Sequence, residues 1–73
     1  MVKKTREEVI EEIKTSINHI REQGRKKYFG MFPNISKQDE NFFRLGLLAE
    51  GYSFVDVRVC PRGIMDVIVE IGG

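Results

Sequence analysis

The stretch from residue 52 to residue 71 constrains the fold of this chain most strongly, because it has the pattern of a β-hairpin. Apolar residues take every second position of both halves: Val55, Val57 and Val59, then Met65, Val67, Val69 and Ile71. Alternation of period two is typical of a strand with one buried face. The pattern therefore predicts strands at about 52–60 and 64–71.

The turn between these strands fixes their register. Pro61 presets φ for the first corner of a type I turn, and Gly63 accepts the positive φ that follows. A two-residue loop would put the apolar sets of the strands on opposite faces, whereas the three-residue loop Pro61–Gly63 puts them on one face. Cys60 should then lie opposite Ile64. The predicted pairs are Val59 with Met65, Val57 with Val67, Val55 with Val69 and Arg58 with Asp66.

Two helices are expected upstream of the hairpin, at about 6–23 and 37–50. Residues 5–8 form a capping-box pattern, isoleucines follow at helical spacing, and Gly24 is a natural stop. Ser36 is the expected N-cap of the second helix. Residues 27–32 fit either a short third strand or an extended loop.

The predicted fold class is therefore α+β. Residues 1–73 should form a single domain in the order helix, short strand, helix, β-hairpin, with both helices on one face of a small two- or three-stranded sheet.

The second helix has a wider apolar surface than one sheet can cover. One patch contains Phe42, Leu45, Gly46 and Ala49, and a second contains Phe43 and Leu47. Glycine costs about 1 kcal/mol relative to alanine inside a helix, so Gly46 should mark a close approach to another element. Surplus apolar surface indicates a partner, and a second copy of the chain is the simplest one. We expect a homodimer through Phe43, Leu47 or the edge strand 64–71.

Catalytic chemistry is not expected. The chain has one cysteine, Cys60, and one histidine, His19, which excludes an internal disulfide and a cysteine-based zinc cluster. The sequence contains no paired carboxylates, nucleophile with a base, or phosphate loop in a recognisable arrangement. We therefore expect no catalytic, cofactor-binding or metal-binding residues, and a non-enzymatic protein-interaction or regulatory module acting as a homodimer.

An alternative function is suggested by a basic segment followed by aromatic residues. In residues 25–32, the cations Arg25, Lys26 and Lys27 precede the aromatic residues Tyr28, Phe29 and Phe32. Such cations bind phosphates, and aromatic faces stack on bases. A nucleic-acid-binding regulator using these residues is therefore the competing hypothesis. Its weakness is the near balance of 12 basic and 11 acidic residues, a net charge of +1.

The Gly72-Gly73 end resembles the C-terminus of ubiquitin-like sulfur carriers, whose terminal carboxylate is activated. That resemblance, limited to two residues, implies sulfur transfer as a remote alternative. Those carriers open with a hairpin, whereas this sequence opens with an expected helix. The absence of a long apolar run or a signal-peptide pattern leads us to expect a cytoplasmic protein with no membrane partner.

Overall fold

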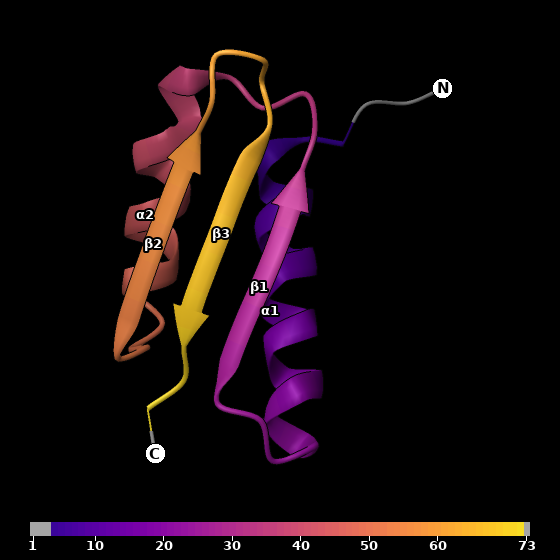
Figure 1. Cartoon of the computed structure of the whole chain (residues 1–73), viewed down its shortest axis with the longest axis vertical. Helices are drawn as coiled ribbons and strands as arrows, with labels where there is room; N and C mark the ends of the chain where they lie inside the picture. The colour runs from indigo at the N-terminus through magenta and orange to yellow at the C-terminus, as the bar shows by residue number, and fades with distance from the viewer. Residues whose placement is uncertain (1–3, 73) are drawn as a thin grey trace.

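The computed structural model describes residues 4–72 and has two α-helices and a three-stranded antiparallel sheet. Both helices lie against the same face of the sheet, and no described part of the chain covers its other face (Figure 1). This arrangement confirms the α+β class and the predicted order of elements. The elements are α1 (Arg6–Glu22), β1 (Lys27–Phe32), a 3-10 turn η1 (Lys37–Asp39), α2 (Glu40–Leu48), β2 (Phe54–Val59) and β3 (Met65–Glu70).

The hairpin of β2 and β3 has the predicted register. Cys60 N–H donates to the Ile64 carbonyl over 2.9 Å, and Gly63 N–H donates to the Cys60 carbonyl over the same distance. Gly63 has φ +82°, the left-handed conformation that a three-residue loop requires. All four predicted pairs are present: Val59 with Met65, Val57 with Val67, Val55 with Val69 and Arg58 with Asp66.

Strand β3 lies in the centre of the sheet, in the order β1-β3-β2. Residues 27–32 form a full strand antiparallel to β3, with Tyr28 opposite Val69 and Phe32 opposite Met65. The expectation that residues 64–71 form an exposed edge strand is therefore wrong. The physical reason is that β1 occupies the side of β3 that the hairpin alone would leave unpaired.

The helices begin with the expected caps. In α1, Thr5 Oγ1 accepts from Glu8 N–H and the Glu8 side chain accepts from Thr5 N–H, which completes the capping box. Ser36 accepts from Gln38 N–H, but it caps η1, so the first turn of the predicted second helix is 3-10 rather than α-helical. The α-helix α2 starts at Glu40 and ends at Leu48, and is thus shorter than the predicted 37–50.

The core lies between the helices and the covered face of the sheet. Its fully or nearly fully buried members are Val9, Ile13, Ile17, Phe43, Leu47, Val57, Val59, Met65, Val67, Val69 and Ile71. A Cβ on Gly46 would lie 2.5 Å from Ile10 Cδ1, which confirms that Gly46 marks the close approach of α2 to α1.

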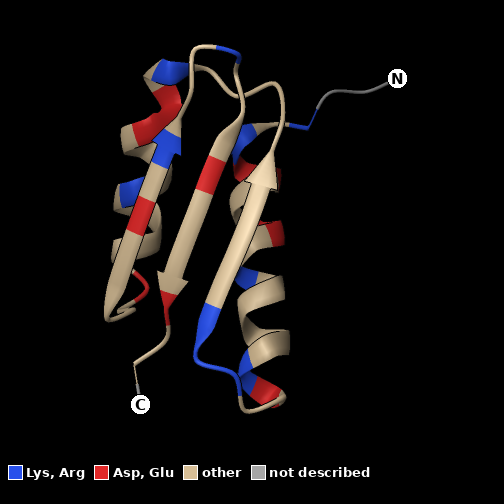
Figure 2. Cartoon of the chain, in the orientation of Figure 1, with Lys and Arg blue, Asp and Glu red and all other residues tan. Residues whose placement is uncertain are grey.

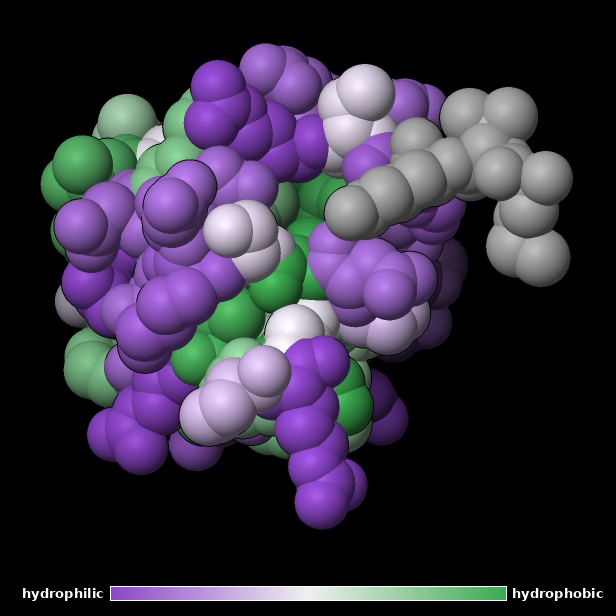
Figure 3. Space-filling model, turned by 90° about the horizontal axis from the view of Figure 1, so that it is seen from above, coloured by the Kyte–Doolittle hydropathy of each residue, from purple (hydrophilic) through white to green (hydrophobic). Residues whose placement is uncertain are grey.

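The end of the molecule that carries the β2–β3 loop is closed by the segment before η1. Ile35 N–H donates to the Gly63 carbonyl over 2.8 Å, and Ile35 packs against the core. Seen from this end, hydrophobic surface crosses the middle of the molecule between hydrophilic flanks (Figure 3).

Candidate functional site

The uncovered face of the sheet is the first candidate for an interaction surface. Alternate residues of all three strands point to it, and the strand pairing arranges them in three rows: Lys27-Glu70-Phe54, Phe29-Ile68-Asp56 and Met31-Asp66-Arg58. Three large apolar side chains on this face are strongly exposed: Phe29 at 62%, Met31 at 59% and Phe54 at 46%. We call this set of nine residues the open face.

Charge on the open face is mixed and slightly negative. Lys27 and Arg58 are its cations, and Asp56, Asp66 and Glu70 are its carboxylates, so its net charge is −1. The Arg58 guanidinium pairs with Asp56 of its own strand, at 3.7 Å from Nε to Oδ2. Asp66 and Glu70 both lie on the central strand, where a polyanion crossing the face would meet them.

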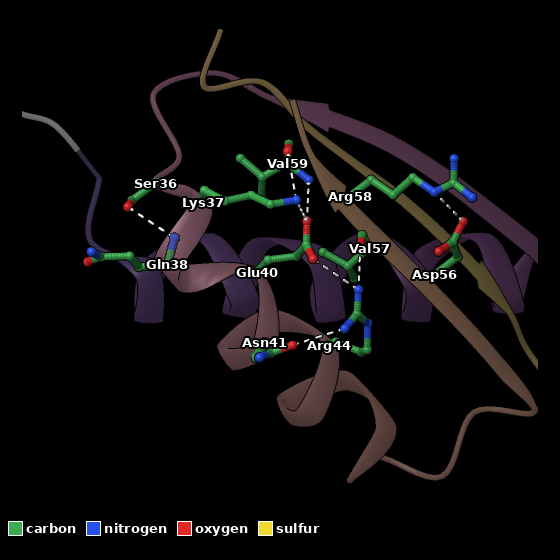
Figure 4. Close-up of polar contacts among 10 residues, drawn as sticks. All are labelled: Ser36, Lys37, Gln38, Glu40, Asn41, Arg44, Asp56, Val57, Arg58 and Val59. Atoms are coloured by element: carbon green, nitrogen blue, oxygen red, sulfur yellow. Dashed lines mark hydrogen bonds and ion pairs between the residues drawn. The ribbon is translucent and has the colours of Figure 1, made fainter. Parts of the chain in front are cut away.

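The free edge of β2 is closed by side chains from η1 and α2 (Figure 4). Val59 N–H donates to the Glu40 carboxylate over 2.9 Å, and Arg44 donates to the Val57 carbonyl over 2.9 Å. Lys37 Nζ lies 3.4 Å from the Val59 carbonyl. These backbone groups are the ones that an added strand would need, so this edge is protected against further pairing.

Glu40 is the centre of this edge network. Its carboxylate accepts from Lys37 at 2.8 Å and from Arg44 at 3.2 Å, as well as from Val59 N–H. The hydrogen bond from Lys37, followed by that from Val59, lowers the Glu40 pKa from 4.5 to about 2. Glu40 is therefore ionised at neutral pH and holds both of its cationic neighbours against the strand.

The free edge of β1 has no such cover in the described part of the chain. Ile71 N–H donates to the Lys26 carbonyl over 2.8 Å, so even-numbered residues of this segment bond to β3. In an antiparallel ladder the alternate residues Lys27, Phe29 and Met31 then turn their N–H and C=O groups outward. Within residues 4–72, no side chain is hydrogen-bonded to these outward groups.

The residues of the predicted nucleic-acid segment do not form one surface. Arg25, Lys26 and Lys27 are exposed at the end of the molecule where α1 meets β1 (Figure 2). Tyr28 instead packs partly against the core, on the helix-covered side of β1. Burial, and then the neighbouring Glu12 of α1, raises the pKa of its hydroxyl. Phe29 lies instead on the open face, two positions after Lys27 on the same side of β1.

Phe43 and Leu47, the predicted partner-binding residues, are fully buried in the core of the single chain. Neither side chain is available to a partner in this fold. The outward side of α2 instead exposes Leu45 at 65% and Leu48 at 46%, with Ala49 beside them. We call Leu45, Leu48 and Ala49 the α2 stripe.

The sequence did not indicate that Phe29 and Met31 would be exposed, because both faces of β1 carry apolar residues. Alternation alone separates Tyr28, Gly30 and Phe32 from Phe29 and Met31, but it does not say which set is covered. Gly30 belongs to the covered set: it has no side chain, and the Tyr28 ring fills the space that a Cβ there would take. Nothing in the sequence indicated that Glu40 and Arg44 would close the edge of β2.

Among residues 4–72, no group of three or more His, Cys, Asp or Glu side chains is arranged to hold a metal ion. In the same part of the chain, no helix combines the length and the apolar character needed to cross a membrane. Gly73, half of the Gly-Gly end, lies outside the described residues. Comparison with protein-family models, curated proteins and solved structures found no match to this chain.

Proposed function

We propose that this protein is a non-enzymatic interaction module that acts as a homodimer and binds another protein. The observation that carries the proposal is the exposure of five large apolar side chains among residues 4–72: Phe29, Met31, Leu45, Leu48 and Phe54. Exposed apolar side chains gathered on two separate surfaces indicate contacts with other chains.

The α2 stripe is the surface best suited to a second copy. In a two-fold symmetric contact, each residue near the axis meets its own counterpart, so like charges there would repel. The stripe is uncharged, and the charged residues of the same helix, Glu40 and Arg44, are bonded to each other and to β2. By contrast, two open faces packed together would bring the carboxylates of the two central strands close to one another.

Sedimentation equilibrium tests the dimer with a matched pair of variants. The wild-type protein should show a mass well above the 8.5 kDa of one chain at micromolar concentration. Leu45→Glu should return it to the monomer mass. Phe29→Glu changes a side chain of nearly equal exposure, 62% against 65%, and should leave the dimer intact. A wild-type mass of 8.5 kDa at high concentration would rule out the dimer.

A further inference from the structure

The two edges of the sheet differ in a way that points to a binding site. At the β2 edge, Glu40 and Arg44 occupy backbone groups that a new strand would need. At the β1 edge, the outward N–H and C=O groups of Phe29 and Met31 carry no hydrogen bond from within residues 4–72. Exposed edges of this kind pair readily with an extended chain, and most proteins protect them.

We propose that the free edge of β1 binds an extended segment of another protein as a fourth, antiparallel strand. This proposal rests on the proposed interaction function and names the class of partner. The segment would bond to the outward backbone groups of Lys27, Phe29 and Met31. Its matching side chains would lie on the open face, next to those three residues.

An antiparallel pairing with β1 of a second copy does not fit the same edge. α1 lies directly behind β1 and packs against it (Figure 1). Paired strands are about 4.8 Å apart, whereas packed helices need about 8–10 Å between their axes. If β1 paired with β1 of a second copy, the two α1 helices would therefore overlap. The edge has room for a strand that brings no helix of its own on that side.

The side chains beside the edge define the chemistry of the incoming segment. Phe29 and Met31 are apolar and strongly exposed, so the residues opposite them should be apolar. Lys27 lies at the start of β1, with Arg25 and Lys26 just before it. An antiparallel segment reaches this end with its own C-terminal residues. We therefore infer an extended segment with alternating apolar residues and a carboxylate near its C-terminal end.

The probe is a synthetic peptide, acetyl-Thr-Val-Thr-Val-Thr-Glu-Thr, with its two valines and its glutamate set opposite Met31, Phe29 and Lys27. Hydrogen exchange of single amides, followed by NMR, reports directly on the edge. At a peptide concentration of about ten times its dissociation constant, exchange at Phe29 and Met31 should slow about tenfold. The amide of Val55, at the outer side of β2, should not change.

Modified peptides separate backbone pairing from simple apolar attraction. N-methylation of the second valine removes the donor that faces Phe29 and should weaken binding by about tenfold. N-methylation of the threonine before it removes a donor that points away, and should have little effect. Replacing the peptide glutamate by lysine should weaken binding to the wild type and restore it to Lys27→Glu.

The result of the peptide test is independent of the result of the dimer test. The monomeric Leu45→Glu variant should bind the peptide as the wild type does, because the α2 stripe and the β1 edge are separate. Absence of amide protection at Phe29 and Met31 up to several millimolar peptide would overturn the edge site, whatever the oligomeric state. The edge site would also be overturned if these amides were protected in the free protein and lost their protection on dilution. A second copy of the chain would then be paired with the edge of β1.

Discussion

Gly30 lies where the ring of Tyr28 crosses β1 on the helix-covered side. A Cβ at this position would lie 2.8 Å from Tyr28 Cζ and 3.1 Å from Phe32 Cε2, and would also press on the Tyr28 hydroxyl oxygen. Because the Tyr28 ring packs partly against the core, moving it costs packing contacts. Gly30→Ala should therefore lower the free energy of unfolding by about 1–3 kcal/mol, the usual range for overpacking. Urea denaturation measures the change.

A second substitution identifies the contact responsible. Tyr28→Phe removes the hydroxyl that lies nearest to the added methyl group. In the double variant, the loss due to Gly30→Ala should be smaller than in the wild-type background, because contacting residues are not additive. Equal losses in both backgrounds would mean that the Tyr28 hydroxyl is not the obstacle.

Glu40 makes the closed edge of β2 sensitive to acid. Its pKa is about 2 in the folded chain, below the ordinary 4.5, chiefly because Lys37 and Val59 N–H bond to the carboxylate. A depressed folded pKa adds stability above pH 4.5, and this stability is lost as pH falls toward 2. We expect the thermal midpoint of Glu40→Gln to depend less on pH across this range than that of the wild type.

The control for this pH profile is Glu22→Gln, which removes an exposed carboxylate from the last turn of α1. Its profile should follow the wild type between pH 2 and pH 4.5, the window set by the Glu40 shift. If both variants flatten the profile equally, the acid sensitivity belongs to the charge of the whole chain rather than to the β2 edge.

At the scale of elements, the hairpin was predictable because its information is local. Residues 52–71 contain both the alternation and the turn, and only one loop length puts the valines of β2 and the apolar residues of β3 on one face. The position of β1 was not predictable in the same way. Its partner lies more than thirty residues away, with Phe32 opposite Met65, and its two faces are both apolar. The length of α2 was overestimated because nothing in residues 37–39 distinguishes a 3-10 turn from the first turn of an α-helix.

The hairpin loop gives the prediction at this scale. Deleting Gly63 would shorten the loop to two residues and turn the apolar side chains of β3 away from α1 and α2. Since β3 is the central strand, both of its ladders would lose their register. We expect the deletion variant to unfold or aggregate, as judged by circular dichroism and size-exclusion chromatography.

A milder change in the same loop serves as the comparison. Gly63→Ala keeps the loop length and strains only the positive φ of +82°, a cost of about 1 kcal/mol. This variant should remain folded with a lower thermal midpoint. A deletion variant with an unchanged midpoint would contradict the role of the loop in fixing the register.

Over the whole molecule, the sheet and α2 each have apolar residues on two sides, one side buried in the core and the other exposed. The helices use one face of the sheet for the core, and α2 turns Phe43 and Leu47 inward while Leu45 and Leu48 remain outside. The sequence predicted a wider apolar surface on α2 than one sheet can cover, and it placed the dimer contact on Phe43 and Leu47, which the fold buries. Which side of α2 is buried depends on where α1 and the sheet contact it, and no local sequence pattern gives this information.

The distribution of charge leads us to expect weak binding of nucleic acid. Arg25, Lys26 and Lys27 are gathered at one end of the molecule, while carboxylates lie along the centre of the open face (Figure 2). A nucleic acid that stacked a base on Phe29 would therefore approach Asp66 and Glu70 of the central strand. We expect only weak binding of labelled single-stranded DNA or RNA in fluorescence anisotropy, with a dissociation constant of about 10⁻⁴ M or weaker at physiological salt.

Replacing Arg25, Lys26 and Lys27 together by alanine completes this test. All three residues are exposed, so the variant should keep its stability within about ±0.5 kcal/mol, which separates a binding defect from unfolding. Arg62→Ala, in the hairpin loop at the opposite end, is the control for the loss of a cation elsewhere. Tight binding that weakens steeply with salt, survives Arg62→Ala and is lost in the triple variant would establish nucleic acid as the partner. The triple variant can instead leave the weak anisotropy signal unchanged and lower the affinity for the glutamate-containing peptide of the edge test. In that case the three cations serve the β1 edge, because each attracts the carboxylate near the C-terminal end of the added strand.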